Sequence, residues 1–86
     1  MKLRGEFVVR QLMDEIVAIP VGNQPVGGMV LLNPVSAEIW KALEQETDLE
    51  GIVSAVTDAF EVSEEEARAD ILELLEQLRN AGLLDE

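Results

Sequence analysis

The chain contains no cysteine and no histidine. Without thiols it can form neither disulfides nor thiolate metal ligands, and without imidazole it lacks the usual base of Ser–His and Cys–His catalytic sites. We therefore expect no cofactor, no metal site and no catalytic residue. A small enzyme that uses paired carboxylates is the alternative, but the 18 Asp and Glu residues lie mostly at predicted helix starts and on polar faces.

Long apolar runs are also absent. Uninterrupted runs such as Met29–Leu32 are only four residues long, whereas a membrane-spanning helix needs about 20. No basic start is followed by a long apolar segment, so the sequence predicts neither a secretion signal nor a membrane span. We expect a cytoplasmic protein, and a length of 86 residues predicts one domain over residues 1–86.

Positive charge is scarce. The chain has 6 Lys and Arg against 18 Asp and Glu, for a net charge of −12, and residues 1–35 sum to zero, so the rest of the chain carries all of it. Binding to DNA or RNA requires clustered cations that displace counterions from phosphates. The charge therefore disfavours a nucleic-acid partner. The acidic surface serves either solubility or a basic partner, and the sequence leaves both open.

Three apolar segments in the first part of the chain predict an antiparallel meander. They are Glu6–Leu12, Ile16–Val21 and Met29–Leu32. Met13–Glu15 is a short polar connection that makes the first two a β-hairpin, and Gly22–Gly28 is the clearest turn-former before the third. Because Pro20 cannot donate to a β-ladder, we expect the second strand to end near Ile19.

Three amphipathic helices are predicted after these strands. They should cover Pro34 to about Glu44, Thr47 to about Phe60, and Ser63 to Gly82. Asn33 is the expected cap of the first, and Thr47 and Ser63 each begin a capping box. The apolar stripes that should pack inward are Val35, Ile39, Ala42 and Leu43; Leu49, Ile52, Val53, Val56 and Phe60; and Ala67, Ile71, Leu74, Leu75 and Leu78. We expect Trp40, the only tryptophan, in the core or at its edge.

The two outer strands of the predicted sheet differ in charge. The first carries Glu6 and Arg10, whereas the third, formed by Met29, Val30, Leu31 and Leu32, carries none. Charges on an edge strand oppose unwanted pairing, so only the third offers bare backbone groups to an extended peptide. Each added backbone hydrogen bond would contribute about 0.5–1.5 kcal/mol. Alternatively, the protein's own N-terminal residues or a second copy of the chain cover this edge.

One flank of the third helix combines cations and leucines. Arg68, Leu72, Leu75 and Arg79 follow one another at spacings that place them on the same side of a helix. This flank is the candidate wall of a groove beside the third strand. The alternative is that both arginines only pair with nearby acids such as Asp70, which contributes a few tenths of a kcal/mol each.

Several short motifs occur together between Leu32 and the C-terminus. They are Leu32–Asn33, Ile39–Trp40, Thr47 to Ile52, Asp70–Leu72 and Gly82–Leu83. In this order and spacing they resemble the PqqD family. The chain departs from the commonest family pattern at Pro34–Ser36, where many relatives have Thr or Ser followed by Gly. Its N-terminal strands match the family poorly.

The resemblance implies an α+β, winged-helix-like domain with a three-stranded antiparallel sheet followed by three helices. It implies a recognition element, not a catalyst, for ribosomally made precursor peptides that are later modified. Such proteins bind the leader of the precursor as an added strand and present it to a modifying enzyme, often a radical S-adenosylmethionine enzyme. In the family the leader lies along the third strand and against the third helix. That site corresponds to Met29–Leu32 and to the flank of Arg68, Leu72, Leu75 and Arg79.

The sequence therefore predicts a peptide chaperone or adaptor. Two further functions stay open, a nucleic-acid-binding winged helix and a generic dimerising interaction module. A recognition helix for nucleic acid should be basic, whereas the predicted helices here carry only Lys41, Arg68 and Arg79 against many acids. No pattern in the sequence specifies the precursor or the modifying enzyme. Both a monomer and a homodimer are consistent with it.

Overall fold

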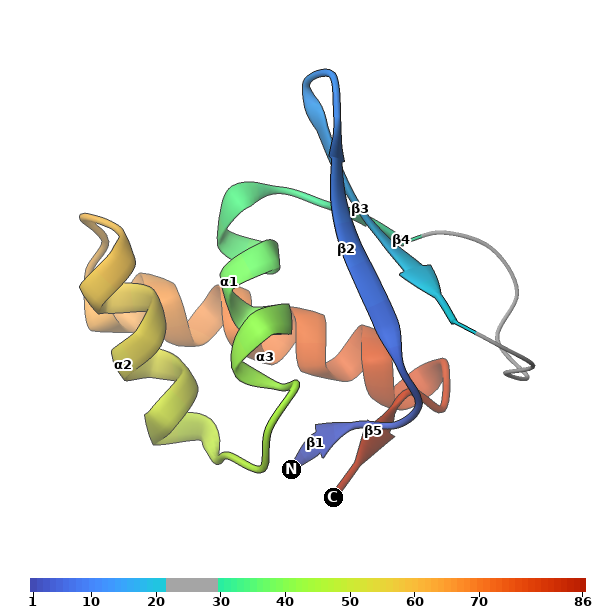
Figure 1. Ribbon diagram of the computed structural model, residues 1–86. Helices are drawn as coiled ribbons and strands as arrows, with labels where there is room; N and C mark the ends of the chain where they lie inside the picture. Colours follow the sequence, from blue (N-terminus) through green and yellow to red (C-terminus); the bar gives the residue numbers. More distant parts are fainter. Residues whose placement is uncertain (22–29) are drawn as a thin grey trace.

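The computed structural model describes residues 1–21 and 30–86, and within them a three-stranded sheet precedes three helices (Figure 1). The elements are β1 (Lys2–Leu3), β2 (Phe7–Leu12), β3 (Glu15–Pro20), β4 (Val30–Leu32), α1 (Pro34–Ala42), α2 (Leu49–Ala59), α3 (Glu64–Asn80) and β5 (Leu84–Asp85). This order confirms the predicted α+β architecture. The predicted turn at Gly22–Gly28 and the predicted strand residue Met29 lie outside the described residues.

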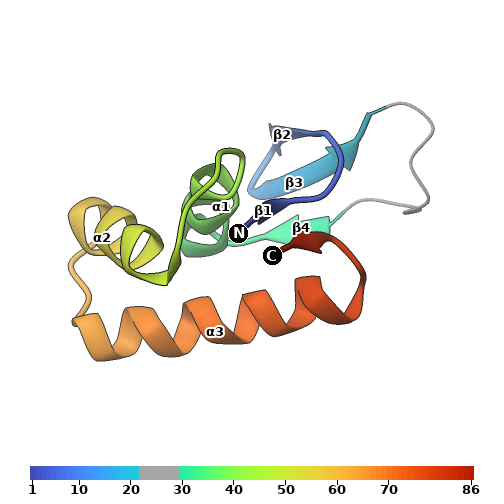
Figure 2. The same cartoon turned by 90° about the horizontal axis from the view of Figure 1, so that it is seen from below.

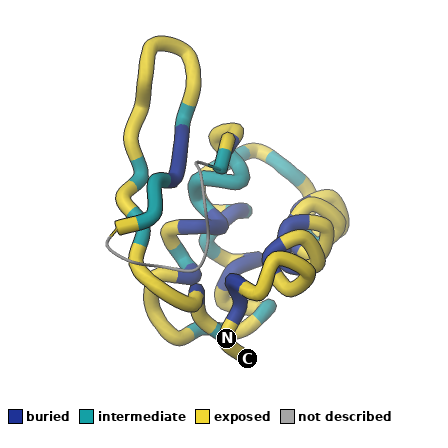
Figure 3. The backbone as a smooth tube through the Cα atoms, turned by 90° about the vertical axis from the view of Figure 1, so that its right-hand side faces the viewer, coloured by how far each residue is buried: buried dark blue, intermediate teal, exposed yellow. Residues whose placement is uncertain are grey.

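Strands β2 and β3 form a hairpin that extends beyond the helices, with an exposed tip (Figures 1 and 3). Leu12 pairs with Glu15, so the loop between them is two residues long, one fewer than the sequence predicted. Met13 takes a positive φ of 59° in this loop, as the tight two-residue hairpin turns require. Strand β3 ends at Pro20, whereas its pairing with β4 involves only Ile16 to Ala18. The missing N–H of Pro20 therefore interrupts no hydrogen bond between β3 and β4.

Strand β4 lies at one edge of the sheet, in the order β2-β3-β4. Ile16, Val17 and Ala18 of β3 pair with its three residues. Its side chains alternate between the faces of the sheet, so Leu32 is buried while Leu31 is 66% exposed. The third predicted strand is therefore an edge strand, as the sequence indicated.

The three helices begin at side-chain caps, and two of the caps are those predicted. Asn33 Oδ1 accepts a hydrogen bond from the Ser36 amide at 2.8 Å, and Ser63 Oγ accepts one from Glu66 at 3.1 Å. The prediction that Thr47 caps α2 is wrong. Asp48 does so, with its carboxylate accepting from the Gly51 amide at 2.8 Å. A carboxylate also interacts better with the positive start of a helix than a hydroxyl does.

Helix α3 ends in a Schellman motif. Gly82 has a φ of +74°, the amide of Gly82 donates to the Arg79 carbonyl at 3.1 Å, and the amide of Leu83 donates to the Leu78 carbonyl at 2.8 Å. This confirms the predicted left-handed cap.

A second, two-stranded sheet follows the cap, in which β5 pairs antiparallel with β1. This sheet is not predicted from the sequence, because strands of two residues are too short to show an alternating pattern. The Arg4 amide adds a hydrogen bond to the Leu83 carbonyl at 2.7 Å. The pairing brings the start and the end of the chain together (Figure 2).

The N-terminal residues also pack on the connection between α1 and α2. The Met1 ammonium donates to the Thr47 carbonyl at 2.6 Å and pairs with Glu46 at 2.5 Å. The Leu3 amide donates to the Leu43 carbonyl at 2.8 Å. These contacts hold residues 1–3 against β5 and the helices. These contacts do not cover the outer edge of β4. They therefore differ from the alternative in which the N-terminal residues cover that edge.

The core lies between the helices and the inner face of the sheet. Trp40 is fully buried, as predicted, and shares the core with most residues of the three predicted stripes. Four stripe residues are only partly buried and pack against this core: Val35, Ala42, Leu49 and Phe60. The other buried members of this core are Leu3, Ala18, Leu32, Ile39, Leu43, Ile52, Val53, Val56, Ala67, Ile71, Leu74, Leu75, Leu78, Leu83 and Leu84. No helix in the described part of the chain is long and apolar enough to cross a membrane.

Candidate functional site

A groove of about 630 Å³ lies between β4 and α1 on one side and α3 on the other. We call it the β4–α3 groove. Its lining residues are Leu31, Asn33, Pro34, Val35, Ser36, Ile39, Phe60, Asp70, Glu73, Leu74 and Gln77. Its volume falls in the range of sites that bind small molecules or a few residues of a peptide.

The β4 side of the groove is an open strand edge. Strand β4 pairs with β3, and no other described residue forms a backbone hydrogen bond with Val30, Leu31 or Leu32. None of these residues is charged, whereas the opposite edge strand, β2, carries the exposed Arg10. A bare edge with no charge is a template for pairing with an extended chain.

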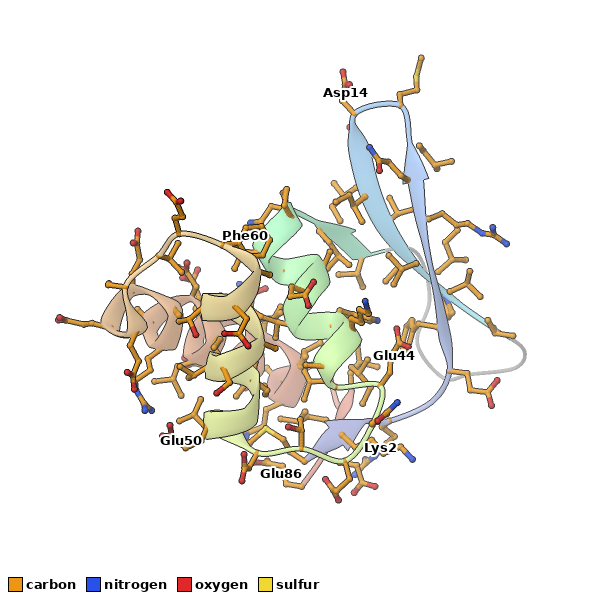
Figure 4. The ribbon with its side chains drawn as sticks, turned by 60° about the vertical axis from the view of Figure 1, so that its left-hand side comes forward. Lys2, Asp14, Glu44, Glu50, Phe60 and Glu86 are labelled. Atoms are coloured by element: carbon orange, nitrogen blue, oxygen red, sulfur yellow. The ribbon has the colours of Figure 1, made fainter. Side chains whose placement is uncertain are left out.

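The groove has an apolar floor. Ile39 of α1 is 1% exposed and Leu74 of α3 is 8% exposed, so both present a small surface at the bottom. Phe60, the C-cap of α2, also lines the groove and lies close to the start of α1 (Figure 4). The cap residue Asn33 fixes the direction in which α1 leaves β4. Because Ile39 and Leu74 belong to the core, the floor of the groove is part of the packed interior.

The α3 side of the groove is acidic. Asp70, Glu73 and Gln77 are exposed side chains that line it around the buried Leu74. Among the described residues, neither Asp70 nor Glu73 forms an ion pair. The lining contains no Lys or Arg. The groove therefore combines an open strand edge, an apolar floor and an unneutralised negative wall.

The flank of α3 that the sequence analysis selected is on the other side of the helix. None of Arg68, Leu72, Leu75 and Arg79 lines the groove. Leu75 is 3% exposed and belongs to the core, while Leu72 is 52% exposed outside the groove. The geometry thus corrects the predicted wall. Of the predicted strand residues, Leu31 lines the groove, Val30 and Leu32 form the same edge, and Met29 is not described.

Both arginines of that flank are engaged in ion pairs. Arg68 contacts Glu50 of α2 at 2.6 Å and Glu64 at 3.0 Å, and Arg79 contacts Glu86 at 2.8 Å. Figure 4 shows Glu50 and Glu86 at the edge of the molecule away from Phe60. The alternative that the arginines pair with neighbouring acids agrees with this arrangement. Glu64 is an acid one helix turn from Arg68, as expected, whereas Glu50 and Glu86 lie outside α3.

The same contacts shift the pKa values of the partners. Arg68 donates hydrogen bonds to the carboxylates of Glu50 and Glu64, which raise its pKa, the bond to Glu50 most. Arg79 donates to the carboxylate of Glu86, which raises the pKa of Arg79. In return, Arg79 lowers the pKa of Glu86. Both arginines are exposed enough that solvent screens these pairs. They hold the ends of α3 to α2 and to the C-terminus, and they leave the groove without a cation.

Comparison with known proteins identifies the family. The family described as "Coenzyme PQQ synthesis protein D (PqqD)" matches residues 9–84, which include the whole lining of the β4–α3 groove. The chain belongs to the PqqD family. No curated protein matches this PqqD-family chain.

A solved structure resembles the PqqD-family chain along nearly its full length. It is described as "TbiB1 in Complex with the TbiA(beta) Leader Peptide", is 28% identical, and aligns with a TM-score of 0.74. The alignment covers 99% of this chain and 95% of that one. The aligned part of this chain therefore includes the sheet and the three helices.

Proposed function

We propose that this PqqD-family protein binds the leader segment of a ribosomally synthesised precursor peptide as an added strand on β4. The observation that carries the proposal is the uncharged outer edge of β4, which pairs with none of the described residues and lies beside the β4–α3 groove. The protein acts as an adaptor without catalytic activity of its own, and presents the bound precursor to a modifying enzyme, which we propose is a radical S-adenosylmethionine enzyme.

Backbone pairing and side-chain burial contribute separately to this binding. Each hydrogen bond between the leader and β4 contributes about 0.5–1.5 kcal/mol and is tolerant of sequence. Selectivity comes from leader side chains that enter the groove, over Ile39 and Leu74. The exposed Leu31 is the largest apolar side chain that β4 offers to such a partner.

Two further observations support a peptide over other ligands. The structural relative is described as a complex with a leader peptide, and no residue in the described part of this chain pairs with the outer edge of β4. The acids Asp70 and Glu73 on the groove wall would repel the phosphates of DNA or RNA. A second copy of the chain could also pair with β4, and the experiments below separate that outcome from leader binding.

The binding site is tested by titration of the isotope-labelled protein with the leader segment of a precursor encoded beside its gene. We expect amide shifts at Val30–Leu32 and at the groove residues of α3. Shifts confined to other surfaces would contradict the proposal. Concentration-dependent shifts at β4 without peptide would instead indicate self-association.

A pair of leucine substitutions makes the test quantitative. Leu31 and Leu72 are both exposed, at 66% and 52%, but only Leu31 lines the groove. Leu31→Lys places a charge on the edge and removes apolar contact, so we expect leader affinity to fall about tenfold. Leu72→Lys adds the same charge away from the groove and should leave the affinity nearly unchanged. Equal losses in both variants would argue against the β4 site.

Presentation requires a separate measurement. The modifying enzyme encoded nearby is incubated with the precursor, with and without this protein, and modification is followed by mass spectrometry. We expect faster modification with the wild type than with Leu31→Lys, and none with the adaptor alone. An enzyme that is indifferent to the adaptor would overturn presentation while leaving leader binding intact.

A further inference from the structure

We propose that the β4–α3 groove selects a basic leader segment, with a Lys or Arg that faces Asp70 and Glu73 and an apolar residue over the groove floor. The inference rests on the proposed function and adds the chemistry of the peptide. It starts from two exposed carboxylates on the wall of a groove that has no basic residue in its lining.

The two carboxylates act together because of their position on α3. Asp70 and Glu73 are three residues apart and therefore lie on the same side of the helix. Their negative charges repel each other, and no cation among the described residues pairs with either. A peptide cation placed between them would relieve this repulsion.

The protein's own cations are held away from the groove. Arg68 and Arg79 are on the opposite flank of the same helix, in ion pairs with Glu50, Glu64 and Glu86. Lys41 of α1 is not part of the lining. The positive charge that complements the wall must therefore come from the ligand.

The apolar floor defines the second requirement. Ile39, Phe60 and Leu74 line the groove beside the carboxylates. Alternate residues of an added strand point to the same face of the sheet. A peptide that satisfies both parts of the groove therefore carries an apolar residue and a Lys or Arg two positions apart.

The test uses short random peptides displayed for selection on the full-length protein. The same selection is run on Asp70→Asn/Glu73→Gln and on a control, Glu65→Gln/Glu76→Gln. The control removes the same charge from exposed positions of α3 that do not line the groove. It accounts for unspecific attraction of basic peptides to a protein with a net charge of −12.

We expect peptides selected on the wild type and on the control to carry the basic and apolar residues two positions apart, and those selected on Asp70→Asn/Glu73→Gln to lose the basic residue. A synthetic peptide of the selected sequence should bind that variant roughly three- to tenfold more weakly than it binds the wild type. The difference should shrink as salt rises, since salt screens exposed charges.

Two results would overturn the inference, and they differ from a failure of the proposed function. Selected peptides that shift the amides of β4 but have no basic preference would overturn the charge requirement alone. An equal loss of affinity in the control variant would do the same. Peptides that never shift the amides of β4 would overturn strand addition itself, and the charge requirement with it.

Discussion

Phe7 of β2 meets Trp40 of α1 edge to face, with ring centroids 5.1 Å apart and ring planes at 89°. This geometry is a favourable one for aromatic pairs. It joins the sheet to the helical layer at the residue next to Ile39, which forms part of the groove floor. The contact therefore helps to set the position of β4 relative to α1.

Removing the Phe7 ring should destabilise the fold. We expect Phe7→Ala to lower the free energy of unfolding by about 2–4 kcal/mol, because it leaves a gap beside the fully buried Trp40. The fluorescence of Trp40, the only tryptophan, reports unfolding in denaturant. Val8→Ala, on the other face of β2 and 38% exposed, is the control. Similar losses in the two variants would mean that the ring pair is not a main contact between the layers.

The cap of α2 gives a second prediction. Asp48 accepts a hydrogen bond from the Gly51 amide, whereas the Thr47 side chain makes only a contact of 3.5 Å, to the Asp48 carbonyl. Asp48→Ala should therefore lower stability by about 1 kcal/mol, and Thr47→Ala by clearly less. Denaturation of the two single variants side by side checks this. A larger loss for Thr47→Ala would restore the cap that the sequence predicted.

Most of the fold follows from local sequence signals. Apolar spacing placed the three helices, and residues with strong local preferences, such as Asn33, Ser63 and Gly82, marked their ends. Thr47 and Asp48 are both good caps, and their spacing to the following residues did not decide between them. The pairing of β1 with β5 could not be predicted, because it depends on where the Schellman motif directs the last residues of the chain.

Only the β4 side of the groove can be recognised in the sequence. The absence of charge on β4 is visible in the sequence, and so is the position of β4 at an edge once three strands are expected. The wall of α3 was assigned to the wrong flank, because Leu72 and the two arginines stood out as unusual. Asp70, Leu74 and Gln77 follow one another at i, i+4 and i+7, so they also lie along one side of the helix. Which flank faces β4 depends on how α1 and α2 bring the chain back to the sheet.

The C-terminal cap of α3 gives a third prediction. Gly82 has a φ of +74°, and a side chain added there would meet no atom within 4 Å. The loss in Gly82→Ala is therefore conformational, and we expect about 1–2 kcal/mol in the free energy of unfolding. Gly82→Asn should lose less, because Asn tolerates this conformation better. If Ala and Asn were equally destabilising, a cause other than backbone conformation would be needed.

The ion pair between Glu46 and the Met1 ammonium predicts a dependence of stability on pH. The ammonium lowers the pKa of Glu46 from its ordinary value of 4.5, chiefly through a hydrogen bond. A carboxyl whose pKa is lower in the folded state stabilises the fold above its unfolded pKa, and this contribution disappears as the pH falls through the folded pKa. The contribution of Glu46 should therefore be complete at neutral pH and vanish in acid below 4.5.

Glu46→Gln tests this relationship. At neutral pH the variant should unfold at a lower denaturant concentration than the wild type, and the two midpoints should converge as the pH falls below 4.5. Glu44→Gln removes a neighbouring carboxyl that forms no ion pair with the described residues, and its midpoint should follow that of the wild type. Because the Met1 pair is exposed on the Glu46 side, at 77%, added salt should reduce the difference at neutral pH. A difference that persists unchanged in acid would show that Glu46 acts through packing and not through its charge.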